Sequence, residues 1–147
     1  MLSMQEMSDR MEIQDLMVRY AYAIDDRDFD KLDSVFTDDA IIDYSEAGGA
    51  KGSLEDIKKY LPDAMKAFPG FQHLSACTEI KLDGDTAETR TILFNPMVHG
   101  EGKDQSVFFI GLWYEDKLRR TDDGWRIASR RERMSWVHNA PEGMMPD

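Results

Sequence analysis

The stretch Ile13–Phe36, IQDLMVRYAYAIDDRDFDKLDSVF, decides how this chain folds. Apolar residues recur in it at the spacing of one helix face: Ile13, Leu16, Met17, Tyr20 and Ile24. Because each helical residue turns the chain by about 100°, Asp25 falls on the flank of this face, close to the expected end of the helix. The stretch therefore predicts a first helix packed on a core, with a carboxylate at the edge of that core.

Asp25 has two interpretations at this point. It is a surface acid at a helix end, beside Asp26 and Asp28, or it is a carboxylate at the rim of a pocket. Spacing alone favours the surface acid, because acids are mostly exposed in proteins. Asp28 then predicts the N-cap of a second helix, which carries Phe29 and the apolar residues after it inward.

The composition is that of a soluble globular protein. The chain has 147 residues, 41% hydrophobic and 32% charged, and we expect it to form one domain spanning residues 1–147. A formal charge of −11 argues against a nucleic-acid partner or an anionic membrane. Cys77 is the single cysteine, so no disulfide forms within the chain. There is no apolar run of membrane-spanning length and no secretory pattern at the start, and we expect a cytoplasmic protein.

The first half of the chain reads as helical with one short strand. We expect residues 1–7 to be loose and Ser8 to cap the first helix. Residues 40–44 (AIIDY) predict a strand. Ser53 is placed to cap a third helix, in which Pro62 predicts a break or kink.

The second half changes to long strands joined by tight turns. The predicted strands are residues 71–82, 86–98, 106–120 and 125–136. Asp83-Gly84 is a strong hairpin signal between the first two. Helices followed by a meander of antiparallel strands predict an α+β fold, and strands this long imply a strongly curved sheet that encloses a pocket.

His73 is the most informative histidine. Strand alternation places it on the same side as Ser75 and Cys77. An isolated histidine there is a core residue bonded to a carbonyl, but one paired with a carboxylate is a general base near neutral pH. His99 lies in a polar loop and is expected to be solvated, whereas His138 lies in the tail and could cover a pocket.

Other catalytic templates are missing from the sequence. It has no Walker loop, no GxGxxG after a strand, no GxSxG elbow and no pair of histidines at metal-binding spacing, so we expect no metal and no organic cofactor. A basic run lies on the last strand, where alternation sends Arg131 and Arg133 to one face and Arg130 to the other. Such a run usually balances neighbouring acids, although one arginine could enter a pocket and bind an oxyanion.

Nearly the whole chain resembles the SnoaL-like branch of the NTF2-like superfamily. The resemblance rests on residues 13–44, the Lys51-Gly52 step, His73 at the start of a strand, and residues 111–131, GLWYEDKLRRTDDGWRIASRR. It implies a cone-shaped, half-open barrel in which a strongly curved mixed or antiparallel sheet and three N-terminal helices enclose a pocket.

The resemblance also implies a site. Asp25 and His73 match the catalytic pair of the scytalone dehydratase and bile-acid 7α-dehydratase branch, and that of hexachlorocyclohexane dehydrochlorinase. The side chains expected to bind substrate are Tyr20, Tyr44, Asn95 and Arg131. The chain departs from scytalone dehydratase in two places. Ile24 stands where that enzyme has a tyrosine, and only His99 or Asn95 could correspond to the second histidine of that enzyme.

The implied function is a cofactor-independent lyase, a dehydratase that eliminates water next to a carbonyl in a small, largely apolar cyclic substrate. The alternatives are a small-molecule binding protein without turnover, and a related isomerase or dehalogenating lyase. The segment Val107–Trp113 has apolar residues on the sheet face that the helices leave open. We therefore expect a homodimer or homotrimer that covers this face.

Overall fold

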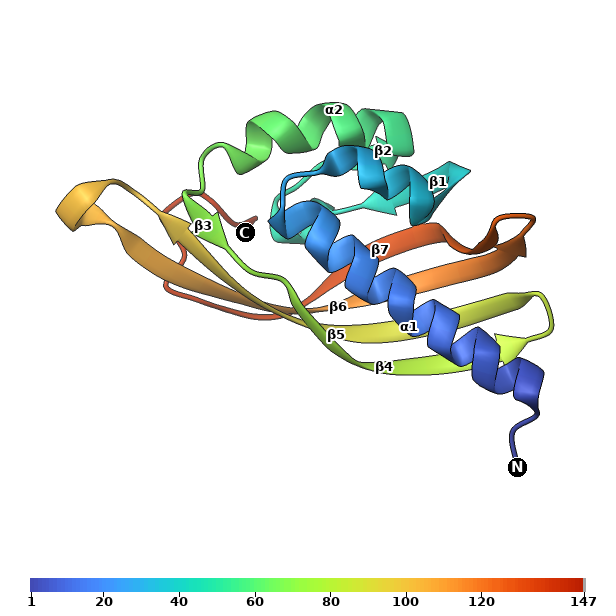
Figure 1. Cartoon of the computed structure of the whole chain (residues 1–147). Coiled ribbons are helices and arrows are strands. Elements are labelled where there is room, and N and C mark those ends of the chain that lie inside the picture. Colours follow the sequence, from blue (N-terminus) through green and yellow to red (C-terminus); the bar gives the residue numbers. More distant parts are fainter. Residues whose placement is uncertain (147) are drawn as a thin grey trace.

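The fold is a curved sheet with helices on its inner side. The computed structural model describes residues 1–146. Its sheet has seven strands in the order β2-β1-β7-β6-β5-β3, with β4 also paired to β5. Only the β1–β7 pair is parallel among the pairings of the described residues, so the sheet is mixed. The expected α+β half-open barrel is confirmed (Figure 1).

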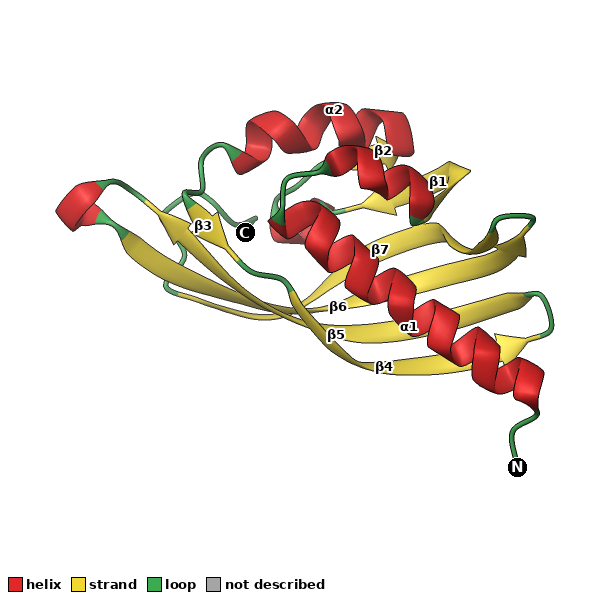
Figure 2. Ribbon diagram, viewed as in Figure 1, coloured by secondary structure: helices red, strands yellow, loops and turns green. Residues whose placement is uncertain are grey.

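The strands are β1 (Phe36–Asp43), β2 (Lys51–Ser53), β3 (Gly70–Phe71), β4 (Leu74–Asp83), β5 (Thr86–His99), β6 (Ser106–Thr121) and β7 (Gly124–His138). The α-helices are α1 (Met4–Asp25) and α2 (Leu54–Met65), and the short 3₁₀ helices are η1 (Phe29–Ser34), η2 (Ser45–Ala47) and η3 (Gly102–Asp104). Helix α1 crosses the sheet obliquely, and α2 lies above β1 and β2 (Figure 2). None of the helices in residues 1–146 is long and apolar enough to cross a membrane.

Helix α1 begins earlier than the sequence predicted. Ser3 and Glu6 form a capping box, in which Ser3 Oγ accepts from the Glu6 amide at 3.1 Å and Glu6 accepts from the Ser3 amide at 2.7 Å. Ser8 is therefore inside the helix and residues 4–7 are ordered, so both expectations were wrong. The buried carboxylate of Asp9 holds this end of α1 to the sheet by accepting two bonds from Arg120, at 2.8 and 2.9 Å.

Two further local predictions are corrected. Asp28 makes no side-chain capping bond, and the element after it is a 3₁₀ helix. Of the break or kink predicted at Pro62, the break is absent, because α2 continues to Met65. Proline removes one hydrogen bond of the helix. The apolar face of α2 is buried on both sides of Pro62, at Leu61 and Met65, and this packing holds the helix together.

The strand around His73 is interrupted. The predicted strand of residues 71–82 divides into β3 and β4, and Gln72 and His73 lie between them. A register shift follows between Ala76 and Glu79, where Cys77 has φ 53° and is exposed. The bulge ends the alternation, so the expectation that His73 and Cys77 share a side was wrong.

A fully buried ion pair lies between α1 and the sheet. The Arg130 guanidinium donates two bonds to Asp116, both at 2.8 Å, and neither side chain is exposed. Its carbon lies 4.1 Å from the ring centroid of Tyr20 and 3.9 Å from that of Tyr114. Such stacking adds attraction between the cation and the rings, so Arg130 fixes the position of Tyr20.

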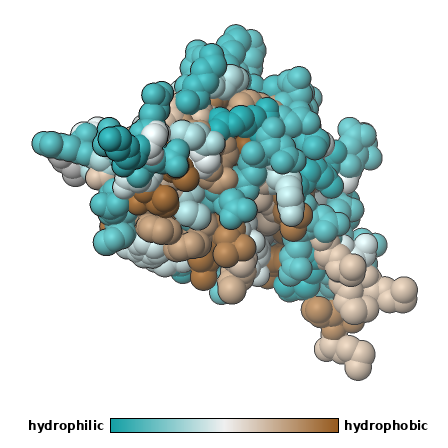
Figure 3. Space-filling model, turned by 60° about the vertical axis from the view of Figure 1, so that its left-hand side comes forward, coloured by the Kyte–Doolittle hydropathy of each residue, from teal (hydrophilic) through white to brown (hydrophobic). Residues whose placement is uncertain are grey.

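The outer face of the sheet carries an aromatic cluster of Phe94, Phe109 and Trp136. The Phe94 ring lies 5.8 Å from that of Phe109 and 6.0 Å from that of Trp136, between centroids. The Trp136 indole lies directly over Gly111, where an added Cβ would come within 2.1 Å of it. Figure 3 shows apolar side chains grouped between hydrophilic margins on one side of the molecule.

Candidate active site

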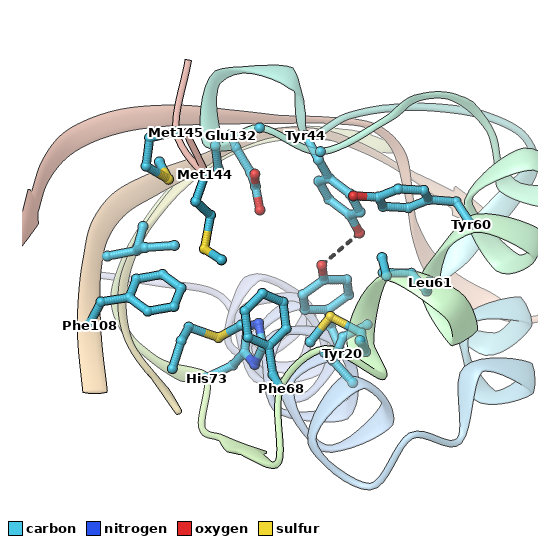
Figure 4. Close-up of a pocket in the computed structure, with 18 residues that line it drawn as sticks. Tyr20, Tyr44, Tyr60, Leu61, Phe68, His73, Phe108, Glu132, Met144 and Met145 are labelled. Atoms are coloured by element: carbon cyan, nitrogen blue, oxygen red, sulfur yellow. Dashed lines mark hydrogen bonds between the residues drawn. The ribbon is translucent and has the colours of Figure 1, made fainter. Parts of the chain in front are cut away.

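A cavity of about 370 Å³ opens on the inner side of the sheet. Helix α2, the end of α1, strands β5 to β7 and the C-terminal segment enclose it (Figure 4). Most of its lining is apolar or aromatic, including Ile24, Leu61, Met65, Phe68, Met97, Phe108, Ile110, Met144 and Met145. Five polar side chains also line it: Tyr20, Tyr44, Tyr60, His73 and Glu132. An apolar pocket with few polar groups is typical of small-molecule sites.

Asp25 and His73 are in direct contact at the edge of this cavity. Asp25 is the last residue of α1, and its Oδ1 lies 2.7 Å from His73 Nδ1. The same carboxylate accepts from the backbone amide of His73, at 3.1 and 3.0 Å. The side chain of His73 is 9% exposed and that of Asp25 24%. Asp25 thus holds both the ring and the backbone of His73.

This contact selects the tautomer of the histidine. A carboxylate accepts only, so Nδ1 of His73 is the donor. In the neutral ring, Nε2 is then the atom with a free lone pair, and no side chain or backbone group of residues 1–146 bonds to it. His73 therefore presents a proton acceptor to the cavity that its ring lines.

Two tyrosine hydroxyls form a pair on the cavity wall. The hydroxyl oxygens of Tyr20 and Tyr44 are 2.6 Å apart. Burial raises the pKa of Tyr20 above its usual value and that of Tyr44 well above it, so both hydroxyls are neutral at physiological pH. Each carries one proton, and only one of them is used between the two oxygens. The pair can therefore donate one hydrogen bond to a ligand.

Glu132 is a pocket residue that the sequence did not single out. Its carboxyl projects into the cavity from β7, opposite His73 (Figure 4), and the residue is 9% exposed. Burial raises the pKa of Glu132 to about 8, with Arg130 opposing this and the negative charges of Asp43 and Glu46 adding to it. The alternation of side chains along β7 could have identified it, because Glu132 lies two residues after Arg130 and therefore points to the same, inner face of the sheet.

The remaining candidates lie outside the lining. Asn95 is buried, and its amide donates to the Gln72 carbonyl at 2.7 Å. It thereby fixes the segment that carries His73. Arg131 is exposed and forms an ion pair with Glu46 at 3.1 Å.

The two other histidines contact aromatic rings. His99 ends β5 with its ring 5.6 Å from that of Phe108, so it is less solvated than expected. His138 lies 6.4 Å from Phe109, between ring centroids. The tail residues that line the cavity are instead Met144 and Met145. In residues 1–146, no group of three or more His, Cys, Asp or Glu side chains is placed to hold a metal ion.

Comparison with known proteins places this chain in a family. The chain is 52% identical to an uncharacterized protein of Mycobacterium tuberculosis H37Rv over 132 residues, which is 90% of this chain and 89% of that protein. Among solved structures, a Kribbella flavida protein superposes with a TM-score of 0.82 at 27% identity, over 90% of this chain and 94% of that one.

Two structures of named enzyme types share the fold. A proposed scytalone dehydratase of Novosphingobium aromaticivorans has a TM-score of 0.80 and 18% identity, covering 92% of this chain and 89% of its own. A hexachlorocyclohexane dehydrochlorinase of Novosphingobium barchaimii has a TM-score of 0.72 and 19% identity, covering 92% and 96%. The model of the SnoaL-like domain matches residues 5–131. The chain therefore belongs to the SnoaL-like domain family.

Proposed function

We propose that this protein is a cofactor-independent lyase, a dehydratase that eliminates water next to a carbonyl in a small, largely apolar cyclic substrate. One observation carries the proposal. The Asp25–His73 pair is hydrogen-bonded at 2.7 Å and borders an apolar cavity. The cavity's size and lining suit a compact apolar molecule, and a donor for its carbonyl is available in the tyrosine pair.

The residues divide the chemistry as follows. Nε2 of His73 takes the proton from the carbon next to the carbonyl, while the Asp25 carboxylate stabilises the imidazolium that forms. The hydroxyl pair of Tyr20 and Tyr44 donates to the carbonyl oxygen as negative charge develops there. The electron pair of the broken C–H bond then forms the C=C bond as the leaving group departs.

Two considerations favour an enzyme over a binding protein. A binding site needs no carboxylate to orient a histidine, whereas a general base does. The fold is also shared with proteins named as a dehydratase and a dehydrochlorinase, which are names for eliminations. Fold alone does not assign a reaction, so the proposal depends on the geometry of this chain's own residues.

The test is a screen of small cyclic and aryl β-hydroxy ketones. Loss of water is monitored through the absorbance of the conjugated product. We expect His73→Ala to abolish elimination and Asp25→Asn to lower its rate by about 10²-fold or more. His138→Ala is the matched control, because this histidine lies outside the lining and should keep the parent rate. Binding of these ketones without any turnover would instead favour the binding protein.

We also propose that the chain self-associates through the outer face of its sheet. The aromatic cluster of Phe94, Phe109 and Trp136 lies there, with Phe94 38% and Trp136 45% exposed. A second copy of the chain would remove these rings from water. Light scattering at micromolar concentration should report a dimer or trimer, and Trp136→Glu should shift it toward the monomer. A parent protein that is monomeric under these conditions contradicts the proposal.

A further inference from the structure

Glu132 is a buried acid without a hydrogen-bond partner in the described part of the chain. The residue is 9% exposed, its carboxyl projects into the cavity, and no hydrogen bond joins it to any group in residues 1–146. It is not needed to neutralise Arg130 either, because Asp116 already accepts two 2.8 Å bonds from that guanidinium. A buried carboxyl that makes no hydrogen bond within residues 1–146 is costly to the fold, so its position calls for a role with a ligand.

The groups around Glu132 come from every element that packs against it. They are Tyr20 of α1, Asp43 of β1, Tyr44, Glu46 of η2, Tyr60 of α2, Tyr114 of β6, Arg130 of β7 itself and, across the cavity, His73. Burial opposes ionisation of Glu132 most strongly, Arg130 favours it even though its guanidinium bonds Asp116, and the charges of the two acids oppose it. The tyrosines are neutral. Glu132 thus has a setting that favours its protonated form.

We infer that Glu132, as a carboxylic acid, gives its proton to the leaving oxygen of the substrate, which makes this a site for expelling a hydroxyl group rather than a halide. The inference rests on the proposed elimination and deepens it by naming the leaving group. Hydroxide is a poor leaving group and departs as water only if it is protonated, whereas a halide departs as a stable anion without a proton. An acid opposite the base therefore assists the loss of a hydroxyl group and is not needed for the loss of a halide.

The step balances without any co-reactant. The C–H bond breaks toward Nε2 of His73, the C=C bond forms, and the C–O bond breaks as the oxygen takes the proton of Glu132. The products are the conjugated carbonyl compound, water, a Glu132 carboxylate and a His73 imidazolium. Transfer of the extra proton from the imidazolium back to the carboxylate, through water in the opened site, restores the starting enzyme.

Burial explains why Glu132 can be protonated at neutral pH. Desolvation raises its pKa to about 8, so most molecules carry the acid at pH 7. A carboxylic acid kept neutral by an apolar site can then act as a donor under conditions where an exposed glutamate cannot. Activity toward hydroxyl leaving groups should consequently fall as pH rises through about 8.

The experiment compares two probes that give the same product. One is the β-hydroxy ketone formed from benzaldehyde and acetone, and the other is its acetate ester, and both yield benzylideneacetone. Acetate leaves as an anion, so its loss needs no acid. For Glu132→Gln we expect about a 10²-fold or larger fall in the rate constant with the alcohol and little change with the ester. Glu88→Gln, an exposed glutamate of the same sheet, is the matched control and should change neither.

The outcomes separate the inference from the proposed function. Equal losses on both probes, or none on the alcohol, overturn the role of Glu132 while the elimination stands. Failure of the parent protein to eliminate from either probe overturns the elimination and the inference together. A second readout needs no turnover: the ¹³C carboxyl resonance of Glu132, assigned by its loss in Glu132→Gln. An ionised carboxyl at pH 7 overturns the inference on its own, and a protonated one supports it.

Discussion

Removing the ionisable group of Glu132 should change how the stability of the protein depends on pH. The pKa of Glu132 rises from 4.5 to about 8 on folding, so the folded state binds this proton more tightly than the unfolded chain. Its contribution to stability is therefore fully present below pH 4.5 and is lost as pH rises through about 8. At pH 7 the loss is about 3 kcal/mol, from about 2.5 pH units at about 1.4 kcal/mol each.

Glu132→Gln keeps the shape of the side chain and cannot ionise. The free energy of unfolding of the variant, relative to the parent, should rise by about 3 kcal/mol between pH 5 and pH 8, or by about 6 to 12 °C in Tm. Guanidinium unfolding followed by circular dichroism at the two pH values measures this difference, in which all other titrations cancel. Parallel stability curves for the two proteins would refute the buried, protonated state of Glu132.

Asp116→Asn should destabilise the protein by about 3 to 5 kcal/mol, because it leaves Arg130 charged and unpaired in the core, and urea unfolding at pH 7 measures this. A loss of stability below about 1 kcal/mol would count against the burial of the Arg130–Asp116 ion pair. The pKa of Asp9 is lowered chiefly by its bonds to Arg120, so its contribution is present at neutral pH and lost in acid. Asp9→Asn should therefore flatten the fall in stability at low pH, and an unchanged acid limb would contradict this. Gly111→Ala should cost about 1 to 3 kcal/mol and alter tryptophan fluorescence, because the new methyl group meets an indole ring. Parent-like stability and emission would show that the indole lies elsewhere.

The fold was predictable because its signals are local and agree with one another. Helical spacing from Ile13 to Ile24, the turn at Asp83-Gly84 and the long alternating strands each correspond to an element of the structure. The Asp25–His73 contact spans 48 residues and could not be derived from spacing. It was expected only through the resemblance to a family, and in the structure the two side chains lie 2.7 Å apart.

The predictions that failed did so because of contacts with residues far away in the sequence. Packing on both sides of Pro62 outweighed a helix-breaking preference, and a bulge at Cys77 reset the alternation of a strand. The sequence did not single out Glu132 because a basic run such as Arg130–Arg133 usually balances neighbouring acids, although the parity of Glu132 pointed inward. Burial of a single face of a charged strand depends on what packs against it, which one strand's sequence does not reveal.

The clamp of Asp25 on both the ring and the backbone amide of His73 has a consequence for how such a protein can diversify. The base is fastened to the end of a helix, at a break between two strands, rather than to the interior of the sheet. Part of the opposite wall is made by Met144 and Met145, unbranched side chains on a segment outside the helices and strands. The proton-accepting histidine and part of the cavity wall therefore come from separate parts of the chain. A substitution in the C-terminal segment can change which ligands fit the cavity without moving Nε2 of His73, the atom that takes the proton.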